Sequence, residues 1–343
     1  MSLGPSPFPP APAEPQPSPG GHGLHPLSVG QLFGLSMRMY RFGWRPLLAA
    51  AALLLVPLYA AQTLVEIVVS PLINRWVTAW EQWLEEFERL ATEPGFETRL
   101  PPLPDFPAGF WEAVLISLLV GVLGAVVGGL AMAAVIFAVG RIYEGSEASA
   151  RDAVGRALRR APSLIGAQLL FFVVAMGIAI LGLGLGVALL AQGAGLLAFV
   201  GAVLLVSATV ALVIVTVRWI FMQQAIMLEG RGAPDGLGRS WRLVGGSALR
   251  VLGYVLLVSV VVGLVGAIFV SIASLLVTGS RPPMDPLTIA LNYLLAGAFT
   301  ILATPFTTIY FTLLYFDIRW RRGESEAQLG QPGGWPYSGQ PRG

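Results

Sequence analysis

Charged residues gather at the end of the last long apolar run, in the sequence LLYFDIRWRRG at residues 313–323. Asp317 stands among aromatic residues, and Arg319, Arg321 and Arg322 follow it closely. A carboxylate beside guanidinium groups can belong to a ligand or catalytic site, but it also forms structural ion pairs where a membrane helix meets water. We favour the second interpretation. We predict that Asp317 pairs with Arg321, one helical turn further on, or with an arginine of another helix on the same side.

The rest of the chain offers few of the combinations that catalysis or metal binding requires. Cysteine is absent, and the two histidines, His22 and His25, lie in a proline-rich stretch. The glycine-rich sequence ILGLGLG at 180–186 lies inside an apolar run, so it does not fit the strand–loop–helix context of a nucleotide-binding loop. Gly182 and Gly186 have instead the four-residue spacing of closely packed membrane helices. We therefore expect no catalytic residue, no bound metal and no cofactor.

The composition indicates a helical membrane protein. Apolar residues make up 55% of the chain and charged residues 12%, about half the charged fraction of a soluble domain. Six apolar runs are long enough for helices that cross a membrane, which takes ~20 residues. They are 47–69, 113–139, 163–190, 196–220, 249–277 and 288–315. We predict an all-α integral membrane domain at 27–322, with six transmembrane helices, between disordered tails at 1–26 and 323–343.

Arginine placement predicts the orientation, because positive charge is enriched in cytoplasmic loops. All 21 basic residues are arginine, and with a cytoplasmic N-terminus 17 of them lie inside. The four on the outside are Arg75, Arg89, Arg99 and Arg281. We therefore predict a multi-pass protein of the bacterial cell membrane with both termini in the cytoplasm. The outer segment 73–112 is predicted to begin with an amphipathic helix on the membrane face or on the bundle. We interpret its acidic residues as a solvated surface, with a cation-binding site as the alternative.

Polar residues inside apolar runs are the default functional candidates in a membrane protein. Glu66 and Asn292 lie towards the outer ends of the first and sixth runs, and Arg218 lies towards the inner end of the fourth. Glu66 is the best candidate for an ion site, although a position at the outer interface explains it better. We find no series of carboxylates that suggests a proton relay.

Three inner segments resemble one another without gaps. They are SVGQLFGLSMR at 28–38, SARDAVGRALR at 149–159 and GAPDGLGRSWR at 232–242, and they align Arg38, Arg159 and Arg242. Each precedes an odd-numbered run, which predicts three helical-hairpin repeats, each preceded by a short cytoplasmic amphipathic helix. We interpret the aligned arginines as contacts to anionic lipid or water, with a specific anionic ligand between the repeats as the alternative.

The ending TIYFTLLYFDIRWRRG and the beginning LSVGQLFGLSMRMYRFGWRPLL resemble uncharacterised bacterial membrane proteins related to the membrane domain of glycerophosphoryl diester phosphodiesterases. The resemblance covers about residues 27–323 and implies an integral membrane architecture. The sequence contains no counterpart of the phosphodiesterase barrel with its His, Glu and Asp residues, so the resemblance implies no catalytic residue.

These observations favour a non-enzymatic polytopic membrane protein, a scaffold or accessory protein that contacts anionic lipid or a partner protein. A transporter or lipid-translocating protein built on the repeats is the alternative. A membrane-embedded lipid enzyme ranks last, because the apolar body lacks paired carboxylates, histidine and a serine–base arrangement. We expect no nucleic-acid partner.

Overall fold

The computed structural model describes residues 27–92, 102–193, 195–278 and 285–324. Every regular element in these residues is a helix, and six helical stretches are long and apolar enough to cross a membrane. They are Val29–Ala91, Phe110–Tyr143, Ala161–Leu190, Leu196–Leu228, Ala248–Leu276 and Pro286–Arg321. The predicted all-helical class with six such helices is therefore confirmed. The predicted tails, except for residues 323 and 324, lie outside the described residues.

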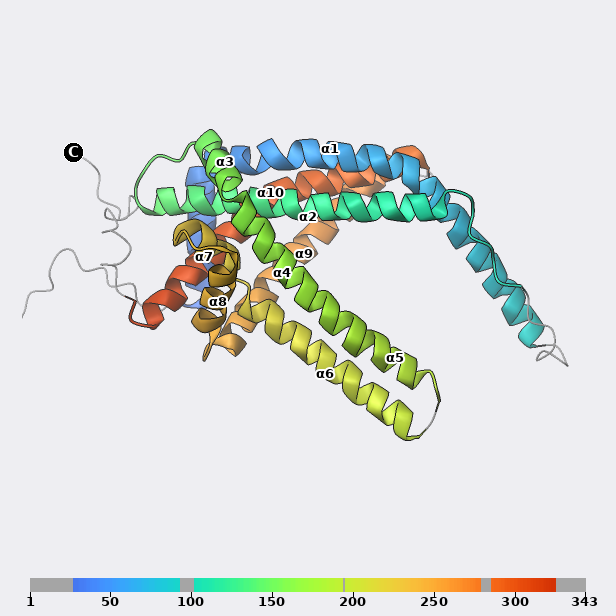
Figure 1. The fold of residues 1–343 in the computed structure, drawn as a ribbon. Coiled ribbons are helices and arrows are strands. Elements are labelled where there is room, and N and C mark those ends of the chain that lie inside the picture. The colour runs from blue at the N-terminus through green and yellow to red at the C-terminus, as the bar shows by residue number, and fades with distance from the viewer. Residues whose placement is uncertain (1–26, 93–101, 194, 279–284, 325–343) are drawn as a thin grey trace, which may run out of the picture.

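Three long helices, α1 (Val29–Ala91), α2 (Phe110–Tyr143) and α10 (Pro286–Arg321), pack side by side, and we call them the central helices (Figure 1). Much of their common core is built from small side chains. Ala131, Ala133, Ala134 and Ala138 of α2 are completely buried, as is Ala50 of α1. Small residues let helix backbones approach closely, which is how helices associate where lipid removes most of the hydrophobic driving force.

A helical hairpin diverges from these central helices (Figure 1). Its first arm consists of α4 (Ala161–Ile178), the π-helical turn η2 (Ala179–Gly184) and α5 (Leu185–Leu190), and its second arm is α6 (Leu196–Arg218). Glycines bring the arms together. A Cβ on Gly182 would lie 2.3 Å from the Cβ of Ala208, and one on Gly186 would lie 2.8 Å from Leu205. Both glycines therefore serve helix packing, as the sequence predicts.

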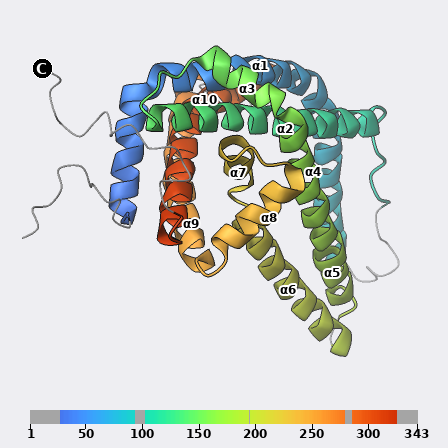
Figure 2. The ribbon, with the colours of Figure 1, turned by 60° about the vertical axis from the view of Figure 1, so that its left-hand side comes forward.

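Short helices gather at one end of the bundle. They are α3 (Ala150–Arg159), α7 (Met222–Leu228), α8 (Ala233–Val244) and the first turns of α1, which a non-helical Gly43 separates from the remainder of that helix. We call this the short-helix end. Figure 2 turns it towards the viewer and shows α3, α8 and the beginning of α1 on different sides of α7. The long helix α9 (Ala248–Thr278) follows α8.

The predicted outer helix at the beginning of 73–112 is not a separate element. Instead, α1 continues to Ala91, and its last turns project beyond the other helices (Figure 1). Trp76 packs on Phe110 at the start of α2, with ring centroids 5.2 Å apart. The following aromatic residues stack on one another along the helix, in the order Trp76, Trp80, Trp83 and Phe87. Aromatic pairs at helical spacing stabilise the continuous helix.

Candidate functional site at the short-helix end

Asp317 is one of the few acidic side chains that the bundle buries, with 7% of the residue exposed. Arg321 Nε donates to its Oδ2 at 2.7 Å, so the predicted pair one turn apart is present. The other carboxylate oxygen accepts a hydrogen bond from the backbone N–H of Leu27 at 2.9 Å. Arg321 also donates to the Leu27 carbonyl oxygen at 3.2 Å. The pair therefore joins the end of α10 to the beginning of the first short helix.

The backbone at this junction is fixed locally by a capping box. The side chain of Ser28 accepts a hydrogen bond from the backbone N–H of Gln31 at 3.3 Å, and the Gln31 side chain accepts one from Ser28 at 2.9 Å. This arrangement satisfies two N–H groups that would otherwise lack partners at a helix start. Leu27 thus enters α1 in a defined direction and presents its own N–H to Asp317.

A larger charged cluster lies at the same end, formed by Glu229, Arg231, Arg239, Tyr315, Arg319 and Glu324. Glu229 lies between α7 and α8 and accepts hydrogen bonds from Arg231 Nε at 2.6 Å and from Arg239 Nε at 3.0 Å. The Tyr315 hydroxyl donates to the same carboxylate, and Arg319 Nη1 lies 3.5 Å from it. The Glu324 carboxylate accepts from Arg239 Nη1 at 2.7 Å and from Arg319 Nε at 2.9 Å. We call this set the charged cluster.

The charged cluster keeps its carboxylates ionised. Burial alone would raise the pKa of Glu229, but hydrogen bonds from Tyr315, Arg231 and Arg239 outweigh it, and the pKa lies below its ordinary value. The hydrogen bond from Arg239 likewise lowers the pKa of Glu324. A carboxylate saturated with guanidinium donors accepts a further proton poorly, so this geometry suits a structural clasp rather than a general base.

The carboxylates at the centre of this cluster could not be predicted from the sequence. Asp317 and Arg321 share one helix face and can be paired from their spacing alone. Glu229 and Glu324 stand in a loop and after the last helix, and no spacing connects them with each other or with Arg239. The sequence offered one indication of the cluster. Glu229 is an acidic residue close to several arginines on the side predicted to be cytoplasmic.

Arg38, Arg159 and Arg242 occupy matching places on the three short helices. The helices begin at aligned residues, Val29, Ala150 and Ala233. The aligned positions 32, 153 and 236 are buried, as are 36, 157 and 240. Each arginine and the apolar residue before it are exposed in all three helices. In the described part of the chain, none of the three arginines forms an ion pair.

Arg218 lies where α6 meets α8. Its Nη1 donates to the carbonyl oxygen of Trp241 at 3.2 Å, and its guanidinium carbon lies 5.0 Å from the centre of the Trp241 ring. The neighbouring Ser240 is completely buried. Its hydroxyl donates to the carbonyl oxygen of Arg218 at 2.7 Å and accepts from the backbone N–H of Phe221 at 3.1 Å. Ser240 therefore holds α8 against the end of α6.

Glu66 and Asn292 lie on α1 and α10, away from the short helices. The Tyr293 hydroxyl, next to Asn292 in sequence, is hydrogen-bonded to Glu66. The Oδ1 atom of Asn292 is buried and has no hydrogen-bond partner. Within the described ranges, no group of three acidic or histidine side chains is arranged to hold a metal ion. Glu66 thus has a tyrosine as its neighbour. A single carboxylate supplies few of the oxygen ligands that a cation requires, so these residues do not form a cation site.

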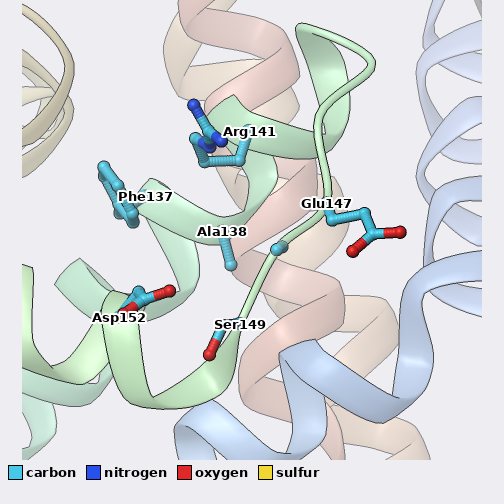
Figure 3. Close-up of a pocket in the computed structure, with 7 residues that line it drawn as sticks. Phe137, Ala138, Arg141, Glu147, Ser149 and Asp152 are labelled. Carbon is cyan, nitrogen blue, oxygen red and sulfur yellow. The ribbon is translucent and has the colours of Figure 1, made fainter.

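A pocket of about 230 Å³ opens between the end of α2 and the start of α3 (Figure 3). Arg141 lines it from α2 and Asp152 from α3, and Glu147 lies on the connecting loop. Phe137, Ala138, Ala148 and Ser149 complete the lining. In the described part of the chain, no hydrogen bond joins the Ser149 hydroxyl to the carboxylate of Glu147 or Asp152, so no activated serine stands in this pocket.

Sequence similarity places the chain in a family. It belongs to the family described as a domain of unknown function (DUF7847), whose model matches residues 27–318. The match includes the three short helices and nearly all of the six long ones. No curated protein and no solved structure matches the chain.

Proposed function

We propose that this member of the DUF7847 family is a non-enzymatic membrane scaffold whose cytoplasmic face binds anionic lipid. The shared surface pattern of the three short helices is the observation behind the proposal. Each helix exposes an arginine directly after an exposed apolar residue, namely Met37–Arg38, Leu158–Arg159 and Trp241–Arg242. An apolar side chain and a cation side by side are what a helix needs to lie in a membrane interface.

The fold is made of three copies of one unit in this proposal. Each unit has a short helix, a long helix that leads away from the short-helix end and a long helix that returns (Figure 1). The aligned sequences, the aligned helix starts and the common burial pattern support the repeat. Three similar helices on one body bind a surface more tightly than one helix, because the second and third contacts form without a new encounter.

The arginine distribution supports a cytoplasmic placement of the short-helix end. Among the described residues, Arg75 and Arg89 lie in the second half of α1, whereas the charged cluster and the three aligned arginines lie at the short-helix end. Arginine near an anionic membrane surface contributes about 1 kcal/mol per residue. Three aligned arginines therefore contribute about 3 kcal/mol, enough to select anionic over neutral lipid. Both termini are cytoplasmic in this placement.

A transporter or lipid-translocating protein is the second candidate. The divergence of the α4–α6 hairpin from the central helices favours it, since an arm held mainly at one end can swing as a unit (Figure 1). The buried residues of α4, Leu164 and Ala167, lie in its first two turns, which agrees with such an attachment. The scarcity of polar residues inside the apolar runs argues against a pathway for a polar solute.

The resemblance to phosphodiesterase membrane domains stays a prediction.

Lipid selectivity in proteoliposomes tests the proposed function. Spin-labelled phosphatidylglycerol and spin-labelled phosphatidylcholine report the fraction of each lipid that the protein immobilises. We expect the wild-type protein to prefer phosphatidylglycerol, and the triple variant Arg38→Gln, Arg159→Gln, Arg242→Gln to lose most of that preference. The control variant Arg75→Gln, at the other end of the first span, should keep it. An unchanged preference in the triple variant would refute the proposed lipid surface.

A further inference from the structure

We propose that a groove between α6 and α9 binds one anionic phospholipid, with the lipid phosphate at Arg218 and an acyl chain along the groove. The inference relies on the membrane placement stated above, but not on the three aligned surface arginines. The bound lipid would join the diverging hairpin to the third unit of the fold, at a place where the protein itself makes little contact.

The groove has the shape and polarity of an acyl-chain site. Its volume is about 370 Å³, and its wall on α6 extends from Thr209 to Arg218. This distance is about 14 Å at 1.5 Å per residue. The other lining residues are Val210, Val213, Ile214 and Val217 of α6 and Ala248, Leu249 and Leu252 of α9. The Thr209 hydroxyl already donates to the carbonyl oxygen of Leu205 at 2.8 Å, so the wall is apolar up to Arg218.

Arg218 stands at the end of this apolar wall with its charge uncompensated. Its Nε is buried without a hydrogen-bond partner, and it forms no ion pair with any described residue. Arg239, Arg319 and Arg321 each contact a carboxylate, whereas the half-buried Arg156 resembles Arg218 in having a buried Nε without a partner. A partly desolvated cation without a counterion is unfavourable, and a phosphate with several acceptor oxygens would supply one.

The surroundings of Arg218 favour a lipid with net negative charge. A Cβ on Gly245, in the turn between α8 and α9, would lie 3.0 Å from Arg218 Nη1, and Arg322 donates a hydrogen bond to the carbonyl oxygen of the same glycine. Two guanidinium groups therefore flank this turn. Trp219 packs near Trp241, with ring centroids 6.1 Å apart. Tryptophan is enriched at the depth where lipid head groups meet acyl chains.

A second groove, which lacks a charged residue, shows by comparison what Arg218 contributes to lipid selectivity. It has a volume of about 320 Å³ and lies between the first turns of α1, α9 and α10, with Phe33, Phe269, Phe299 and Phe306 in its lining. All of its lining residues are apolar. An acyl chain could fill it, but nothing there would select one head group over another. The groove at Arg218 combines an apolar wall with an unpaired cation.

Native mass spectrometry of the full chain in mild detergent tests the inference, with phosphatidylglycerol and phosphatidylcholine as probes. The wild-type protein should retain one phosphatidylglycerol in preference to phosphatidylcholine. Arg218→Gln should weaken that retention at least about tenfold, because a charge-assisted contact is lost. Val213→Trp keeps the arginine but fills the groove, and it should weaken retention as well. Two matched controls should bind like the wild type: Val206→Trp, an exposed α6 position outside the lining, and Arg151→Gln, an exposed position on α3.

The outcomes separate the possible sources of binding. Wild-type retention in Arg218→Gln would overturn the inference, as would equal binding by Val213→Trp and Val206→Trp. Competition by inorganic phosphate at millimolar concentration, together with normal retention in Val213→Trp, would show a free-anion site and would also overturn it. The triple glutamine variant of the aligned arginines should retain this single lipid while losing the broader selectivity. The two proposals can therefore fail separately.

Discussion

Arg239 and Glu324 form a two-pronged ion pair that ties α8 to the chain just after α10. The Nη1 atom of Arg239 donates to Oε1 of Glu324 at 2.7 Å, and Nη2 donates to the other oxygen. The Arg239 Nε also contacts Glu229, so one guanidinium holds two carboxylates. The pair therefore joins α8 to the end of the last long helix.

Replacement of Arg239 should destabilise the fold more than replacement of the more exposed Arg231. The Arg239 side chain is 14% exposed. Its replacement by leucine leaves the carboxylates of Glu229 and Glu324 without the guanidinium group that they share. We expect Arg239→Leu to lower the free energy of unfolding by about 2–3 kcal/mol, since hydrogen bonds to charged groups contribute that much. Thermal unfolding in detergent measures the loss. Arg231→Leu, whose side chain is 37% exposed, is the control and should lose less than about 1 kcal/mol.

The charged cluster should make stability depend on pH in the acidic range. The pKa values of Glu229 and Glu324 lie below their ordinary value of 4.5 in the folded protein. Their contribution is therefore complete above pH 4.5 and is lost as the pH falls through the lowered values. The unfolding temperature of the wild type should fall over this window, and that of the double variant Glu229→Gln, Glu324→Gln should fall less. If the unfolding temperatures of the two proteins change in parallel with pH, the ion pairs of the charged cluster do not stabilise the fold.

The Asp317–Arg321 pair should protect the start of α1. Replacing Asp317 by asparagine removes the charge that accepts from both Arg321 and the Leu27 backbone N–H. We expect faster hydrogen exchange at residues 27–32 and a loss of about 1–3 kcal/mol in unfolding free energy. Arg321→Gln should have a similar effect, and the double variant should lose less than the sum of the two. If the loss of unfolding free energy in the double variant equals the sum of the two single losses, the two side chains act independently.

The two arms of the diverging hairpin should separate when a side chain is added at Gly201. A Cβ there would lie 2.7 Å from the carbonyl oxygen of Gly186 and 2.8 Å from the backbone N of Leu190. We expect Gly201→Leu to cost about 1–3 kcal/mol, the usual range for overpacking. Gly177→Leu in α4 is the control, since a Cβ there meets nothing within 4 Å. Thermal unfolding distinguishes them, and equal losses would contradict the close approach.

Local patterns predicted the helices well, because a long apolar run has few alternatives to a membrane helix. Asp317 and Arg321 could be paired for the same reason, since helix geometry alone places residues four apart on one face. The amphipathic pattern of residues 76–87 predicted a helix but not its continuation from α1, because the pattern is the same in a separate helix. Glu229, Arg239 and Glu324 meet only through the packing of α8 against α10, which no local pattern encodes.

Cysteine labelling can show whether the three short helices form one lipid-binding face. The chain has no native cysteine, so Met37→Cys, Leu158→Cys and Trp241→Cys each give a single thiol beside one aligned arginine. We predict that an impermeant thiol reagent labels all three from the cytoplasmic side of cell membrane vesicles. In proteoliposomes, phosphatidylglycerol should protect all three more than phosphatidylcholine does. Labelling of any one site from the opposite side, or equal protection by the two lipids, would contradict a single lipid-binding face.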